Sequence, residues 1–184
     1  MRMKHTMRYW PNSWMQQLML GRAPQDDPRS LDALAVAWLA YMLADFVQAV
    51  FQAGSWPEAL AMALVDSALV AGFCWAVLRL AGKRERLVQT LTALAGTGAI
   101  LGVIGLPMLY QATRSQPVEA PSGITVLAWL ILLTWNLAVQ AHIYRHALST
   151  RFGIGLLVAG LYTVVAMALL ETGFPDPDNG ENIH

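Results

Sequence analysis

The chain contains 184 residues, of which 56% are hydrophobic and 13% are charged, whereas typical globular chains carry roughly 25% charged residues. Twelve basic and twelve acidic residues give a formal net charge of zero, which argues against a nucleic-acid partner because phosphate binding needs an excess of basic groups. The single cysteine, Cys74, excludes an internal disulfide. The apolar residues fall into five long blocks, which indicates a membrane protein whose first partner is the lipid bilayer.

Residues 1–30 precede the first apolar block and are polar to amphipathic. A short helix is predicted to open near Pro11 and to end at Gly21. Its tryptophan residues, including Trp14, and the nearby basic groups are typical of a helix at the membrane interface. The alternative is a disordered tail. The prolines and acids of residues 23–28 predict a linker before the first span.

Each apolar block is long enough to cross about 30 Å of hydrocarbon as a helix that rises about 1.5 Å per residue. The predicted spans are 31–51, 59–80, 87–110, 123–145 and 152–172. Spanning strands are excluded because these blocks lack clean alternation and an open sheet in lipid would leave backbone groups unpaired. The short connections force neighbouring helices to be antiparallel. We therefore expect an all-α fold, a polytopic bundle of five transmembrane helices with a short amphipathic N-terminal helix.

Lysine and arginine are distributed unequally between the two sides of such a bundle. Eleven lie before the first span or near the second and fourth connections: Arg2, Lys4, Arg8, Arg22, Arg29, Arg79, Lys83, Arg84, Arg86, Arg145 and Arg151. Only Arg114 lies on the other side. Because cytoplasmic loops carry the basic excess, residues 1–30 are predicted to form a cytoplasmic tail. Residues 31–172 then form the five-span domain, and residues 173–184 form a disordered tail outside.

Two acidic residues lie inside predicted spans, Asp45 in the first and Asp66 in the second. They are about equally far from the connection near Ser55, so helical rise places both about 10 Å inside the outer boundary. An intramembrane acid costs about 2.5–3.5 kcal/mol on insertion scales, so it usually faces protein or water. If the two acids face each other, they could share a proton and form a proton or cation site. Alternatively, each is satisfied separately by polar neighbours such as Tyr41 or Gln48.

A second polar set occupies the cytoplasmic halves of the third and fourth spans. Similar depth predicts hydrogen bonds across a shared face, which would serve packing or, as the less favoured interpretation, a substrate site. Its members are Gln89, Thr92, Asn136, Gln140 and His142. His142 and His146 also share a helix face, a spacing that can bind a metal ion. No further ligand completes such a site, so we expect neither a metal ion nor a cofactor.

Four glycines crowd the third span, and Gly98 and Gly102 form a small-xxx-small pattern. Small residues let helix backbones approach closely in lipid. The pattern predicts that this span is central and tightly packed. Pro107 is expected to kink the span or to mark its end.

The stretch from Val88 to Gly98 resembles a segment of small polytopic proteins of proteobacterial inner membranes. The short tail followed by five spans, over residues 30–172, is similar in architecture to Yip1-like membrane proteins. This resemblance implies a five-helix bundle in a bacterial inner membrane with a scaffolding or membrane-organisation role. It supplies no catalytic residues.

Three functions compete. A non-enzymatic scaffolding, assembly or membrane-organisation role, with a membrane protein as partner, is favoured because the loops are small and no P-loop, HExxH, GxSxG or CxxC motif occurs. The second is a small proton- or cation-coupled transporter that uses Asp45 and Asp66. The third is an enzyme that modifies a lipid or a quinone with His142 or an acid as base. A cavity that reaches both acids would favour transport, and a lipid-sized pocket at His142 would favour the enzyme.

Reporter fusions test the predicted orientation. A reporter that works only outside the cytoplasm should be active when fused after His184, because five crossings follow a basic segment that stays inside. A reporter that works only in the cytoplasm should be active when it is inserted within residues 83–86. Cytoplasmic activity at His184 would contradict five crossings with this orientation.

Overall fold

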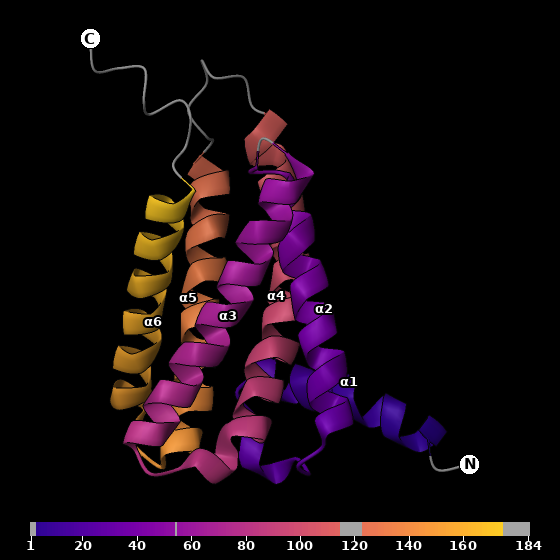
Figure 1. Cartoon of the computed structure of the whole chain (residues 1–184), viewed down its shortest axis with the longest axis vertical. Helices are drawn as coiled ribbons and strands as arrows, with labels where there is room; N and C mark the ends of the chain where they lie inside the picture. The colour runs from indigo at the N-terminus through magenta and orange to yellow at the C-terminus, as the bar shows by residue number, and fades with distance from the viewer. Residues whose placement is uncertain (1–2, 54, 115–122, 175–184) are drawn as a thin grey trace.

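A computed structural model describes residues 3–53, 55–114 and 123–174, and this part of the chain is helical throughout apart from short connections (Figure 1). It contains no strand, which confirms the predicted all-α class. In chain order the elements are α1 (Met3–Leu18), the 3₁₀ helix η1 (Pro24–Asp26), α2 (Leu31–Val50), α3 (Trp56–Leu80), the 3₁₀ helix η2 (Arg84–Arg86), α4 (Leu87–Arg114), α5 (Gly123–Leu148) and α6 (Phe152–Gly173).

The helices α2 to α6 are each long and apolar enough to cross a membrane, as predicted. They stand side by side in Figure 1, whereas α1 lies across the lower end of the bundle. We call the end that carries η2 the lower end and the end with the α2–α3 connection the upper end. Large apolar side chains such as Leu39, Leu157 and Val164 are 65–74% exposed on the outside of the bundle. Surfaces of this kind are suited to lipid, and the chain is an integral membrane protein.

Local sequence signals set most helix boundaries. Ser30 caps α2 by accepting a hydrogen bond from the Ala33 backbone amide at 3.1 Å. Pro57 lies in the first turn of α3, where its missing N–H costs nothing. Pro107 does not end α4, contrary to one of the two expectations, because the helix continues to Arg114.

The helix α4 is central, and its glycines are points of close approach. A Cβ atom at Gly96 would collide with the ring of Trp14 from α1, and one at Gly98 would collide with the ring of Tyr41 from α2. At Gly102 it would meet the Gln48 amide. The small residues therefore let two different helices reach α4.

The N-terminal helix packs into the bundle along one face. Trp14 and Leu18 are buried, together with the polar residues Ser13 and Gln17, whereas Met15 and Met19 on the other face are exposed. The helix also begins eight residues before Pro11, at Met3, and ends at Leu18 rather than at Gly21. It is thus amphipathic, as predicted, but its buried face contacts α4 and α5.

The segment that follows α1 is attached to both of these helices. The indole N–H of Trp135 in α5 donates to the Leu18 carbonyl at 3.0 Å. The Gln89 amide of α4 donates to the carbonyls of Gln25 and Asp27. Arg22 forms a 2.9 Å ion pair with Asp27. Residues 13–27 therefore form a wedge, the N-terminal wedge, against the lower halves of α4 and α5.

Buried side chains concentrate in the lower half of the bundle. Cys74, Leu78, Ile143, Tyr144 and Ala147 are all at most 1% exposed. Most residues of α5 above Asn136 are exposed or half-buried. The lower half is thus closely packed, while the upper half leaves space between the helices. Of the predicted outer tail, 173–184, only Gly173 and Phe174 lie within the described residues.

Gly155 of α6 lies close against the backbone of α5, so a substitution there tests the packing of these two helices. A Cβ atom there would collide with the Ala141 carbonyl group and lie 2.9 Å from the Arg145 backbone nitrogen. Gly155→Ala should therefore lower the stability of the purified protein by about 1–3 kcal/mol through overpacking. Gly160→Ala on the same helix is the matched control, because a Cβ there meets nothing within 4 Å. Thermal unfolding in mild detergent measures both, and equal melting temperatures would contradict this packing.

Candidate functional site: a cavity with two acids between the five spanning helices

A cavity of about 680 Å³ lies between the five spanning helices. It extends from the upper turns of the bundle, at Gln52, Thr125 and Leu170, down to Leu94 and Tyr144. This volume lies within the roughly 300–1,000 Å³ typical of small-molecule sites. The space left between the upper halves of the helices is therefore large enough for an organic ligand.

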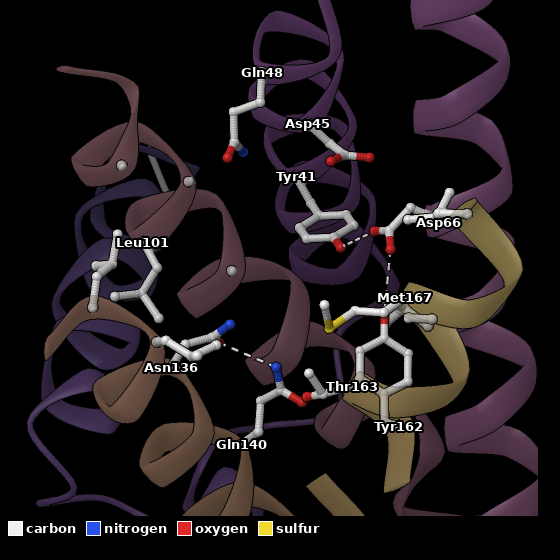
Figure 2. Close-up of a pocket in the computed structure, with 18 of the residues that line it drawn as sticks. Tyr41, Asp45, Gln48, Asp66, Leu101, Asn136, Gln140, Tyr162, Thr163 and Met167 are labelled. Atoms are coloured by element: carbon white, nitrogen blue, oxygen red, sulfur yellow. Dashed lines mark hydrogen bonds between the residues drawn. The ribbon is translucent and has the colours of Figure 1, made fainter. Parts of the chain in front are cut away.

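The cavity brings together the two acids that the sequence placed at equal depth. Asp45 from α2 and Asp66 from α3 both line it. Figure 2 shows Tyr41 and Asp45 projecting from α2 toward the side where Asp66 lies. Tyr41, Asp45 and Gln48 share one face of α2 because residues four and three apart on a helix are neighbours.

Asp66 is held by two tyrosines from two other helices. The Tyr41 hydroxyl donates to its Oδ2 atom, and the Tyr162 hydroxyl of α6 donates to its Oδ1 atom at 3.3 Å (Figure 2). Gly98 permits this arrangement, since the Tyr41 ring passes α4 where a larger residue would block it. Three helices thus meet at one buried carboxyl group, and both of its oxygens accept a hydrogen bond.

Asp45 differs from Asp66 in its surroundings. Its Oδ2 atom is sealed from solvent and accepts no hydrogen bond from the described part of the chain. A buried polar atom without a partner costs about 1–3 kcal/mol, and more if it is charged. Asp45 nevertheless lines the cavity. Unlike Asp66, it therefore has no hydrogen bond from the described residues to Oδ2 that would stabilise a charge on its carboxyl group.

The wall opposite the acids carries amides. The Gln140 amide donates to the Asn136 side-chain oxygen at 3.1 Å, one turn away on α5 (Figure 2). Both residues line the cavity. Below them, Phe73 packs against the rings of Tyr144 and Tyr162, with centroid distances of 6.3 and 5.4 Å. Of these three residues, Tyr144 and Tyr162 line the cavity, and Tyr144 lies at its floor.

The predicted cytoplasmic polar set is divided between two places. Asn136 and Gln140 line the cavity, whereas Gln89 bonds to the N-terminal wedge. The Thr92 hydroxyl donates to the Val88 carbonyl of its own helix at 2.7 Å. The His142 ring bonds to the Arg22 carbonyl at 3.1 Å. The hydrogen bonds of these residues run within one helix or to the wedge, instead of across the α4–α5 face as we expected.

The two histidines contact each other, with ring centroids 4.6 Å apart, but they do not line the cavity. Within the described residues, no group of three histidine, cysteine, aspartate or glutamate side chains could hold a metal ion. The cavity lining offers carboxyl, hydroxyl, amide and aromatic groups for binding.

Several cavity residues were not singled out from the sequence. Tyr162 is the most consequential, because it supplies the second hydrogen bond to Asp66. Its position in the middle of an apolar span was a usable signal, since a buried tyrosine hydroxyl usually finds a partner. Trp129 and Met167 also line the cavity, but nothing in their sequence context separates them from lipid-facing residues.

Comparison with known proteins adds no relative to this description: no family model, no curated protein and no solved structure matches the chain.

The tyrosine contacts of Asp66 predict energetic coupling. Tyr41→Phe should lower stability by about 1–3 kcal/mol, because it removes a donor from a buried carboxyl group. In a double-mutant cycle with Asp66→Asn, the two effects should be non-additive by about 0.5–3 kcal/mol. Tyr144→Phe is the control, since Tyr144 lines the floor without donating to Asp66 in the described structure. Additive effects for the Tyr41 pair, measured by thermal unfolding in detergent, would contradict the bond.

Proposed function

We propose that the chain is a small membrane carrier that couples the movement of a cation to the movement of a proton through Asp45 and Asp66. The observation that carries this proposal is the cavity, which reaches both acids and extends to one end of the bundle. A scaffolding role, which the sequence favoured, requires no such cavity. The Yip1-like resemblance and its scaffolding role stay predictions, without a structural feature in their favour.

The electrostatics of the two acids support coupling. Two carboxylates in a low-dielectric interior cannot both carry a charge comfortably, so at least one needs a proton or a bound cation. Proton and cation therefore compete for the same negative charge. A carrier that exchanges one for the other needs this competition, because each ligand then displaces its counterpart.

The unequal distribution of lysine and arginine between the two ends of the bundle supports an orientation for this carrier. With the lower end and its basic residues in the cytoplasm, the upper end of the cavity faces the outside. The N-terminal wedge and the packed residues around Tyr144 would then lie on the cytoplasmic side of the bundle. We propose an outward-facing arrangement in a bacterial inner membrane.

The enzyme alternative has less support. His142, its proposed base, bonds to a backbone carbonyl and lies outside the cavity lining. The two acids line a space with no grouped metal ligands among the described residues. A binding and exchange site accounts for this arrangement more directly than a reaction does.

Proton movement in proteoliposomes tests the proposal. The purified protein is reconstituted with a pH-sensitive dye inside, and inward gradients of sodium, potassium or benzyltrimethylammonium chloride are imposed in turn. At least one cation should drive proton efflux, and Asp45→Asn and Asp66→Asn should each abolish it by removing a titratable group.

The matched control for this assay is Asp32→Asn. Asp32 lies in the first turn of the same helix as Asp45 but does not line the cavity. This variant should keep the full flux, and all variants should elute as the wild type does in size-exclusion chromatography. Absence of proton movement with every cation, or equal flux in the Asp45→Asn variant, would overturn the proposal.

A further inference from the structure

The two acids of the cavity have unequal roles. Both oxygens of Asp66 accept hydrogen bonds from Tyr41 and Tyr162, so the protein itself supplies its partners. Asp45 lines the same cavity, and its Oδ2 atom has no partner within the described residues. Asp66 is therefore the acid that the protein itself satisfies, whereas Asp45 lines the cavity without a hydrogen bond from the described residues to its Oδ2 atom.

The size and the other walls of the cavity restrict the occupant. An inorganic cation would leave most of its roughly 680 Å³ unused. Four residues with rings, Tyr41, Trp129, Tyr144 and Tyr162, line it, and aromatic rings attract cations at their faces. Leu130, Leu133 and Met167 add an apolar wall. Charge at one side and apolar surface at another match a molecule with a cationic head and an apolar body.

We infer that the cavity binds a monovalent organic cation of the ammonium class, with its charged head against Asp45 and its apolar body along the α5–α6 wall. This inference rests on the proposed carrier function and names its substrate class. The amides of Asn136 and Gln140 lie on α5, where they can form hydrogen bonds with any polar substituent that the otherwise apolar body carries. Asp66 contributes negative charge nearby while its tyrosines keep it in place.

Binding of a simple probe to the full chain in mild detergent tests the inference. The probe is benzyltrimethylammonium chloride, which has a permanent charge and one aromatic ring. Quenching of tryptophan fluorescence is suited to the measurement because Trp129 lines the cavity. Saturable binding is expected, and tetramethylammonium, which has the head alone, and benzyl alcohol, which has the ring alone, should each bind at least about tenfold more weakly.

Variants separate the two acids. Asp45→Asn should weaken binding of the probe by at least about tenfold, because it removes the charge that faces the head. Asp32→Asn should leave the affinity within about twofold, since an exposed charge outside the cavity is screened. Asp66→Asn should weaken binding less than Asp45→Asn does. Thermal unfolding of each variant shows that the comparison is made on folded protein.

The outcomes distinguish this inference from the proposed function. Saturable binding that depends on Asp45, without any proton flux in proteoliposomes, would support the ligand class and overturn the carrier. Proton flux driven by sodium or potassium, without probe binding, would support the carrier and overturn the ligand class. Probe binding unchanged in the Asp45→Asn variant, or equal affinity for benzyl alcohol, would also overturn the inference.

Discussion

The hydrogen bonds from Tyr41 and Tyr162 to Asp66 are the interaction on which the upper half of this bundle depends. A carboxyl group in a membrane interior is tolerated only when its oxygens have partners. Here the partners come from two other helices, so one acid connects α2, α3 and α6. Gly98 is part of the same arrangement, because its missing side chain gives the Tyr41 ring room beside α4.

The two halves of the bundle serve different purposes. The lower end is closely packed around residues such as Cys74 and Leu78, and the N-terminal wedge packs against α4 and α5 there. The cavity begins at the upper end and reaches down to Leu94 and Tyr144. Tight packing at one end therefore holds the helices together, and this allows them to stand apart at the other end without an apolar core between them.

The sequence predicted one level for Asp45 and Asp66, but it could not predict that both residues line one cavity. Helical rise is constant, so hairpin symmetry placed Asp45 and Asp66 at one level, while their facing depends on helix rotations that no local pattern encodes. Glycine patterns within one helix indicated close packing of α4, but they missed Gly155, whose neighbour is the backbone of another helix. The burial of Ser13 and Gln17 was also not predictable, because polar side chains are expected at the surface unless a hydrogen-bond partner such as Asp27 is known.

The attachment of the N-terminal wedge to α5 has a consequence for biosynthesis. Leu18 and Arg22 bond to Trp135 and His142, which follow them by more than a hundred residues. At a synthesis rate of about 5–20 residues per second, the wedge is made before α5, which is the fourth spanning helix. The bonds of Leu18 and Arg22 therefore cannot form until α5 has been synthesised, and the wedge completes its attachment late in assembly.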